Sequence, residues 1–494
     1  MVAVDITRYT MVIDGEHVDS ESGETMDVLN PATNEVVATV PRANEADVDR
    51  AVAAARRAFE GAWAKVSISK RNRLMMRLAE LVRERVDDLA RLETLNSGKA
   101  ISSSKGEILA AVEDLEFYAG AGSKLTGETI PAPAGHLYYT LREPVGVCGQ
   151  IIPWNYPFLM AMWKVAPAMA AGNTVVLKPA SLTPLTAFAL GGLALEAGFP
   201  AGVVNVISGP GASIGAYLAG HPGVNKVAFT GETATGRTIM EIASRTMKRV
   251  TLELGGKSPN IVFEDANLED AINGSVYAIF YNAGQSCEAR SRLFVQESIY
   301  EEFTQRFAEK TRQIRVGDPW NPATHIGAVI SAGQLEGIEG YIQSGRDEGA
   351  TVVTGGERLE DVDLAKGNFL LPTVLSDVTN QMTVAREEIF GPVVVLIPFK
   401  DEADVIAMAN DSIYGLAGTI WTNDVGRAHR VAGSVETGVL GINTPATAMP
   451  GLPFGGYKQS GIGRERGFET LKQYTEVKSV IVNTSTRPVN PWKL

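Results

Sequence analysis

Five short runs of β-branched and apolar residues, separated by stretches with helical spacing, most constrain the fold of this chain. The runs span residues 145–152, 174–177, 203–207, 226–229 and 250–254. Near-continuous apolar strands that alternate with helices are typical of a parallel sheet covered by helices on both faces. We therefore predict an α/β fold, in which ligands bind beyond the carboxyl ends of the strands.

Chemically useful side chains follow four of these runs. Asn155 offers an amide that can stabilise an oxyanion, and Lys178 offers a cation for a ribose or phosphate. Gly231 and Gly236 would let a backbone approach a pyrophosphate at a helix N-terminus, although the middle glycine of the usual fingerprint is missing and an ordinary turn fits equally well. Glu253 is a candidate general base, although a lone glutamate is usually a surface residue.

Cys287 is one of two cysteines in the chain, and it follows a helix predicted over residues 268–282. Ala283 and Gly284 should end this helix and lead into a loop. A thiolate exposed in such a loop is a good nucleophile, whereas a lone cysteine is more often a small buried hydrophobe. Since two cysteines cannot build a disulfide framework, we expect a reducing, cytoplasmic location.

Length and charge exclude several classes of protein. A chain of 494 residues is too long for one core and predicts two or three domains. The net charge of −12 argues against nucleic acid as a partner, since no basic surplus can neutralise phosphates. No apolar run is long enough for a membrane span, residues 1–5 lack a signal-peptide pattern, and we expect no metal.

The N-terminal residues are predicted to form a hairpin and two helices that pack against the rest of the fold. Residues 10–18 have the pattern of a hairpin that turns at Asp14-Gly15. Asn44 can cap a helix that runs to about residue 63, and Ser67 can cap a second helix that reaches Leu89.

The ordered set of Asn155, Lys178, Gly231/Gly236, Glu253 and Cys287 resembles the NAD(P)-dependent aldehyde dehydrogenase superfamily. Other motifs that carry this resemblance are Gly284-Gln285-Ser286-Cys287, Glu387-Glu388-Ile389-Phe390-Gly391-Pro392, Pro453-Phe454-Gly455-Gly456, and Lys458-Gln459-Ser460-Gly461 through Arg464-Glu465. The resemblance runs essentially end to end. It is nearest to the non-acylating class that includes betaine and aminoaldehyde dehydrogenases.

The resemblance implies three structural units. They are a Rossmann-like NAD(P)-binding domain over 1–122 and 143–254, an α/β catalytic domain over 255–456, and a small β oligomerisation arm with the C-terminal tail over 123–142 and 457–494. Expected strands of the catalytic domain include 293–295, 393–398, 416–421 and 439–443, and those of the arm include 137–142 and 477–482. Because unpaired edge strands seek partners, a homodimer or homotetramer is implied.

The family's chemistry carries over to matching residues. Cys287 would attack the aldehyde, Asn155 would hold the oxyanion, and Glu253 would activate the water that hydrolyses the thioester. Lys164 and Glu465 match positions proposed to relay protons or to tune Glu253, although lone charges are more often ordinary ion-pair partners. The residues implied to bind NAD or NADP are Ile152, Pro153, Trp154, Lys178, Ser181, Gly231, Glu232, Gly236, Leu254, Glu388 and Phe390. Those implied to line an aromatic aldehyde tunnel are Tyr156, Trp163, Tyr281 and Phe454.

Two positions bear on specificity. Ser181 lies where relatives that strongly favour NAD often carry glutamate, so we expect NADP to be accepted beside NAD; alternatively, Ser181 only caps a helix over 182–197. Glu288 directly follows the nucleophile, where small or neutral residues are common in the family. Because a carboxylate would raise the pKa of the thiol, we expect Glu288 to point away or to pair with Arg290 or Arg292.

Two alternatives stay open for the function. The aldehyde could be a betaine- or aminoaldehyde-type molecule or a broad range of alkyl and aryl aldehydes. The chain could also be a thiol hydrolase that uses Cys287 and Glu253 without redox chemistry.

Overall fold

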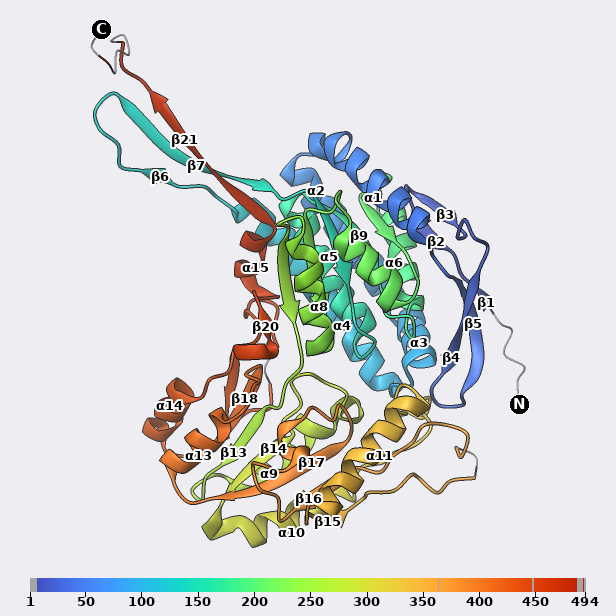
Figure 1. Cartoon of the computed structure of the whole chain (residues 1–494), viewed down its shortest axis with the longest axis vertical. Helices are drawn as coiled ribbons and strands as arrows, with labels where there is room; N and C mark the ends of the chain where they lie inside the picture. Colours follow the sequence, from blue (N-terminus) through green and yellow to red (C-terminus); the bar gives the residue numbers. More distant parts are fainter. Residues whose placement is uncertain (1–6, 363, 447, 487–491, 493–494) are drawn as a thin grey trace.

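The structure is a computed structural model that describes residues 7–362, 364–446, 448–486 and 492. The segment 1–5 and residues 487–491 and 493–494 of the predicted tail lie outside the described residues. Two large mixed sheets, each flanked by helices, form two lobes, and a narrow β arm projects from the first lobe (Figure 1). The predicted α/β fold class is confirmed.

The five predicted parallel strands form the centre of the first sheet. Their order is β12 (Arg249–Glu253), β11 (Lys226–Thr230), β8 (Val147–Ile151), β9 (Thr174–Lys178) and β10 (Val204–Val206), all parallel. The predicted N-terminal hairpin, β2 (Met11–Ile13) and β3 (Glu16–Val18), joins one edge antiparallel. At the other edge, β20 (Gly461–Ile462) pairs antiparallel with β12, so this part of the tail belongs to the first sheet.

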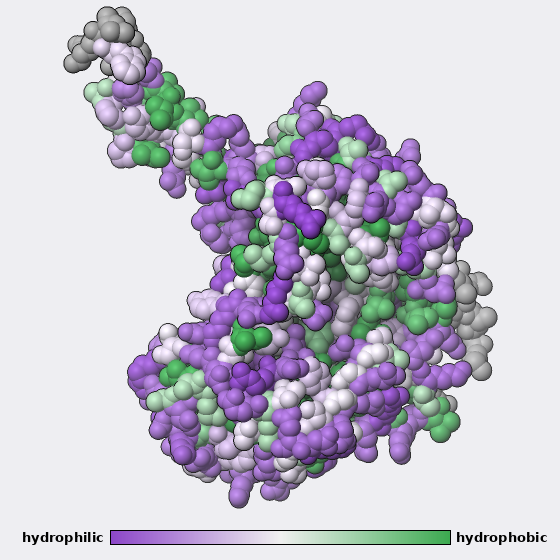
Figure 2. Space-filling view, viewed as in Figure 1, coloured by the Kyte–Doolittle hydropathy of each residue, from purple (hydrophilic) through white to green (hydrophobic). Residues whose placement is uncertain are grey.

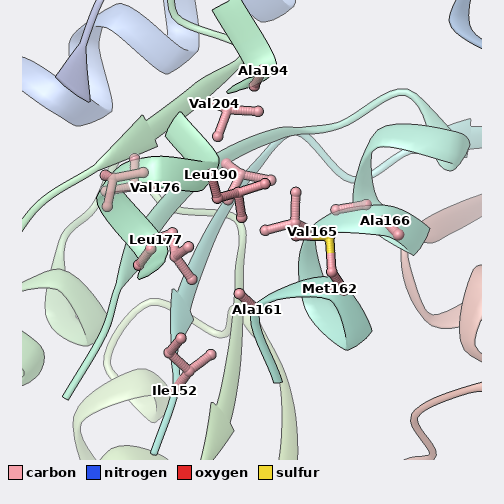
Figure 3. Packing of buried hydrophobic residues seen from close by; sticks show 14 of the residues in the cluster. Ile152, Ala161, Met162, Val165, Ala166, Val176, Leu177, Leu190, Ala194 and Val204 are labelled. Atoms are coloured by element: carbon pink, nitrogen blue, oxygen red, sulfur yellow. The ribbon is translucent and has the colours of Figure 1, made fainter. Parts of the chain in front are cut away.

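Helices cover both faces of this sheet. Helices α5 (Pro157–Ala171) and α6 (Leu185–Glu196) pack on β9 and β10, and Val165, Leu190 and Leu177 meet there (Figure 3). Helices α2 (Ile68–Glu84), α4 (Ile101–Ala121) and α15 (Gly467–Gln473) pack on α5, and α3 (Val86–Ser97) packs on α4 and α6. The remaining helices of this lobe are α1 (Glu45–Glu60), α7 (Ala216–Gly220) and α8 (Thr233–Ser244).

The second lobe holds a seven-stranded sheet. Its order is β15 (Thr351–Thr354), β16 (Thr373–Ser376), β17 (Val393–Phe399), β14 (Arg292–Gln296), β13 (Pro259–Val262), β18 (Ala417–Trp421) and β19 (Val439–Ile442). All neighbours are parallel except β15 and β16. Its helices are α9 (Leu268–Phe280), α10 (Tyr300–Thr311), α11 (Ala332–Asp347), α12 (Thr383–Arg386), α13 (Glu402–Asn410) and α14 (Val425–Ser434).

The arm is an antiparallel sheet of β21 (Thr475–Asn483), β7 (His136–Pro144) and β6 (Thr129–Ile130). Apolar side chains gather on its surface (Figure 2), among them Leu137, Leu141, Val477 and Ile481. A further small sheet of β1 (Thr7–Arg8), β5 (Glu35–Pro41) and β4 (Thr25–Asn30) flanks the first lobe. Across the described residues, no helix is long and apolar enough to cross a membrane.

Helix boundaries differ from the predictions at four places. Asn44 and Ser67 cap α1 and α2 as predicted, but α1 ends at Glu60, three residues early, and α2 ends at Glu84, so that Leu89 lies in α3. Helix α9 stops at Phe280, two residues early, because the backbone turns left-handed at Asn282. Ser181 does not cap a helix: α6 begins only after Pro184, since a proline disfavours helical backbone at the residue before it.

Candidate active site

One cavity of about 580 Å³ lies beyond the carboxyl ends of β8, β11 and β12. Asn155, Glu253 and Cys287, which come from three separate segments, all line it. Asn155 lies just after the carboxyl end of β8, Glu253 is the last residue of β12, and Cys287 lies in the loop after α9. The cavity therefore brings together the three residues with nucleophilic, oxyanion-binding and basic chemistry.

Left-handed backbone shapes the loop that carries Cys287. Asn282, Ala283 and Gly284 have φ of 54°, 56° and 67°, which is costly for the two residues that carry a Cβ. Gly284 is required for a second reason, because a Cβ there would lie 2.1 Å from the carbonyl oxygen of Gly391. The loop after α9 thus leaves the helix in a turn that points Cys287 toward the first sheet.

Side-chain amides hold this turn in place. Asn155 donates through Nδ2 to the carbonyl oxygen of Gln285, at 3.0 Å. Asn282 donates in return to the carbonyl oxygen of Asn155, also at 3.0 Å. The amide oxygen of Gln285 accepts from the backbone N–H of Ile330, at 2.9 Å. Because an amide nitrogen carries two protons, Asn155 keeps one N–H for a ligand.

The Cys287 thiol lies in an electrostatic environment that disfavours the thiolate. Burial, followed by the carboxylates of Glu288, Glu388 and Glu253, raises its pKa well above the usual value. Of the two expectations for Glu288, the pairing is confirmed, because its carboxylate lies 3.4 Å from Arg290, but the residue does not point away, because it lines the cavity. Buried Arg290 also donates to the carbonyl oxygens of Glu288 and Pro445, at 2.7 and 3.3 Å.

Glu253 lies beside a buried ion pair. Its own carboxylate oxygens accept no hydrogen bond from the described part of the chain. Burial, followed by the charge of Glu465, raises the pKa of Glu253 well above its usual value. Glu465 forms a buried ion pair with Lys164, which also donates to the hydroxyl of Thr230, at 2.6 Å. Glu253 therefore holds a proton readily, and a charged pair lies close enough to influence it.

The wall at the carboxyl ends of β8 and β11 has the features of a nucleotide cradle. Glu388 accepts from the backbone N–H of Gly256, at 2.9 Å, and burial raises its pKa to about 7. The rings of Trp154 and Phe390 meet edge to face, with centroids 5.2 Å apart. The other predicted cofactor residues that line this wall are Pro153, Gly231, Glu232 and Leu254.

Four predicted cofactor residues do not line the cavity. Lys178 donates to the carbonyl oxygen of Pro179, at 2.9 Å, and burial lowers its pKa to about 8. Ser181 donates to the carbonyl oxygen of Gly209, at 2.8 Å. Ile152 is buried behind the wall, and Gly236 lies where a Cβ would meet the Leu254 side chain.

The four predicted substrate residues all line the other wall of the cavity. Two of their rings already contact basic groups. Lys99 Nζ lies 4.5 Å from the ring centroid of Tyr156, and the guanidinium carbon of Arg466 lies 5.0 Å from that of Trp163. The rings of Trp163 and Phe454 are 5.2 Å apart.

Comparisons with known proteins agree with this geometry. Residues 17–480 match the "Aldehyde dehydrogenase family". The chain belongs to the aldehyde dehydrogenase family. An aldehyde dehydrogenase of Davidiella tassiana is 49% identical over 473 residues, which are 96% of this chain and 95% of that protein.

Two solved structures are similar over almost the whole of this aldehyde dehydrogenase. Betaine aldehyde dehydrogenase of Staphylococcus aureus, in complex with NAD+, is 41% identical with a TM-score of 0.96, covering 98% of this chain and 96% of that chain. An NAD+ complex of aldehyde dehydrogenase from Bacillus cereus is 47% identical with a TM-score of 0.94, covering 96% of each chain.

The sequence missed several cavity residues of this aldehyde dehydrogenase. Tyr277 lies four residues before Tyr281, with ring centroids 5.1 Å apart, and that helical spacing could have revealed it. Glu107 on α4 also lines the cavity, but no nearby motif signals it. No group of three histidine, cysteine, aspartate or glutamate side chains suited to a metal occurs among the residues described.

Proposed function

We propose that this aldehyde dehydrogenase oxidises an aldehyde to a carboxylic acid with NAD+ or NADP+ through a covalent adduct on Cys287. The observation that carries the proposal is that Asn155, Glu253 and Cys287 line one cavity. Their types match the three tasks of the reaction: attack on a carbonyl, stabilisation of the oxyanion, and activation of water.

The residues of the cofactor wall fit a dinucleotide. Glu388 can accept hydrogen bonds from ribose hydroxyls while the Gly256 N–H fixes its orientation. A Cβ at Gly255 would lie 2.2 Å from the Glu388 carboxylate, so only glycine permits this close packing. Lys178 supplies a cation for the adenosine side. When bound, NAD(P)+ supplies the acceptor for the hydride lost by the aldehyde carbon.

The chain's own groups then account for the other steps. The thiolate of Cys287 adds to the aldehyde carbon, and the free N–H of Asn155 donates to the resulting alkoxide; one such donor is typically worth about 3–4 kcal/mol. After oxidation, a thioester remains on Cys287. Glu253 takes a proton from the water that attacks this thioester, which releases the acid and restores the thiol. The positive charge of Lys164 would favour the ionised form of Glu253, and the negative charge of Glu465 would favour its protonated form, so the ion pair would tune proton uptake and release by Glu253.

Ser181 supports use of both cofactors. Compared with a glutamate at this position, a serine lacks the negative charge that would repel a 2′-phosphate. Its hydroxyl proton is engaged with Gly209, so the serine would permit a phosphate chiefly by being neutral.

For the substrate, we propose an aldehyde with a cationic tail. Apart from the base Glu253 and the cofactor-wall residues Glu232 and Glu388, the cavity is lined by the carboxylates of Glu107 and Glu288, and no lysine, arginine or histidine in the described part of the chain lines it. The basic partners Lys99 and Arg290 lie behind Glu107 and Glu288, so the negative end of each pair faces the cavity.

One observation favours uncharged alkyl or aryl aldehydes as a second candidate. Tyr156 and Trp163 each already hold a basic group near the ring, which weakens their attraction for a further cation. Betaine aldehyde and its uncharged isostere 3,3-dimethylbutanal differ only in charge, so their kcat/KM values decide between the two candidates. A preference for the isostere would contradict the cationic substrate.

The same assay tests the redox chemistry. Formation of NADH or NADPH with either aldehyde is the expected result, whereas no cofactor reduction with any aldehyde, together with hydrolysis of an added thioester, would instead favour a thiol hydrolase. The apolar side chains exposed on the arm support a homodimer or homotetramer, because β21 is an edge strand that a second copy could cover. The cytoplasmic location stays a prediction.

A further inference from the structure

Arg466 is held in an unusual position for a charged side chain. Its φ of 57° is left-handed, a conformation that costs a residue with a Cβ about 1–3 kcal/mol unless its surroundings fix it. The residue is 3% exposed and follows Glu465 of the buried ion pair. Strain of this kind directly behind the cavity residue Trp163 calls for a compensating contact.

Asp114 on α4 supplies that contact. Its carboxylate accepts from Nε and Nη2 of Arg466, at 3.0 and 3.2 Å. It accepts a third hydrogen bond from Trp163 Nε1, at 3.0 Å. Asp114 is fully buried, so this carboxylate binds the arginine and the indole at once in a site that excludes water.

The contacts continue to the second ring of the aldehyde wall. Arg466 lies against the Trp163 ring, and Trp163 packs on Phe454. The backbone of Phe454 exchanges two hydrogen bonds with Glu465, each 2.7 Å long, which returns the chain to the neighbour of Arg466. The five residues Asp114, Trp163, Phe454, Glu465 and Arg466 thus form a closed ring of contacts.

We propose that Asp114 and Arg466 are a positioning pair that determines which aldehyde tails the cavity accepts, by fixing the rings of Trp163 and Phe454. The inference rests on the proposed function, because it assigns this wall to the aldehyde. Acetaldehyde has no tail that could pack on these rings. A branched tail packs on them and depends on their exact placement.

The test compares KM and kcat for acetaldehyde and 3,3-dimethylbutanal, which are both uncharged. The double variant Asp114→Asn with Arg466→Gln removes both charges, so that neither is left buried and unpaired. We expect its KM for 3,3-dimethylbutanal to rise at least fivefold, with KM and kcat for acetaldehyde within twofold of the wild type. Arg466→Lys keeps the positive charge but cannot donate two parallel hydrogen bonds to Asp114. Its KM for 3,3-dimethylbutanal should lie between those of the wild type and the double variant.

Trp163→Phe tests whether the pair acts through the Trp163 ring. It should shift the ratio of the two KM values by itself, and adding the double substitution to it should change the ratio less than twofold, because both act through the same ring. Additive effects, an unchanged ratio, or equal losses for both aldehydes would overturn the inference. If the double variant does not fold, as judged by thermal unfolding and NAD+ binding, Arg466→Lys carries the same comparison. A wild type that oxidises neither aldehyde would refute the proposed function instead.

Discussion

The side-chain amide of Asn155 donates to the carbonyl oxygen of Gln285, 130 residues further along the chain, with an N···O distance of 3.0 Å. This bond joins the end of β8 to the loop that carries Cys287. One amide can therefore serve two purposes: one N–H fixes the loop that carries Cys287, and the other would be available for the proposed oxyanion. The geometry couples the position of the nucleophile to that of its oxyanion donor.

Substitution of Cys287 and of Cys148 should have opposite effects on the rate of aldehyde oxidation. Cys287→Ala should abolish aldehyde oxidation, at least a thousandfold in kcat, and leave folding and NAD+ binding intact. Cys148 is fully buried in β8, and burial raises its pKa to about 12, so Cys148→Ala should keep most activity. Initial rates of cofactor reduction measure both. The reverse pattern would make Cys287 a packing residue.

Removing the base should slow the second half of the reaction. In Glu253→Gln the thioester still forms, but water attacks it poorly because no carboxylate takes the proton. Stopped-flow measurements should show a burst of reduced cofactor equal to the enzyme concentration, followed by turnover at least a hundredfold slower than in the wild type. Absence of the burst would mean that Glu253 acts earlier, on the Cys287 thiol.

The pH dependence should respond to Glu288. Burial and then the Glu288 charge raise the pKa of Cys287, so the thiolate fraction, and with it kcat/KM, should increase with pH. Glu288→Gln removes the like charge and keeps an acceptor for Arg290. Its kcat/KM profile should therefore rise at lower pH than that of the wild type.

The rate of Cys287 alkylation by iodoacetamide, measured as a function of pH, gives the pKa of the thiol without turnover. Glu301→Gln, an exposed change on α10, is the control and should move neither profile. A Glu288→Gln profile that coincides with the wild type would show that the carboxylate does not influence the thiol.

The cofactor preference should depend on Ser181. Ser181→Glu places a negative charge near the adenosine ribose, where it would repel a 2′-phosphate and accept from the ribose hydroxyls. We expect kcat/KM for NADP to fall at least tenfold while that for NAD is unchanged or higher. Wild-type enzyme that does not use NADP, or equal effects on both cofactors, would refute this assignment.

The sequence predicted the elements whose signals are local. Strand-length apolar runs located β8 to β12, and the side chains of Asn44 and Ser67 marked the starts of α1 and α2. Residues just after strands β8 and β12 lie at the cavity because parallel strands present their carboxyl ends on one edge.

Features that depend on distant partners could not be predicted in this way. Asp114 and Arg466 lie 352 residues apart, and neither carries a local pattern that marks a buried pair. The start of α6 is a local exception: Pro184, three residues after Ser181, outweighs a good capping residue, so the helix begins later than its pattern predicts. Glu107 reaches the cavity only through the packing of α4 on α5.

The most direct test of covalent aldehyde oxidation is mass spectrometry of the enzyme quenched in acid during turnover with an aldehyde and NAD(P)+. Glu253→Gln should accumulate the adduct, and the peptide that contains Cys287 should gain the mass of the acyl group. No such mass should appear without cofactor, or on the peptide that contains Cys148. Reduced cofactor formed with an unmodified Cys287 peptide, or an acyl group on another residue, would contradict the account.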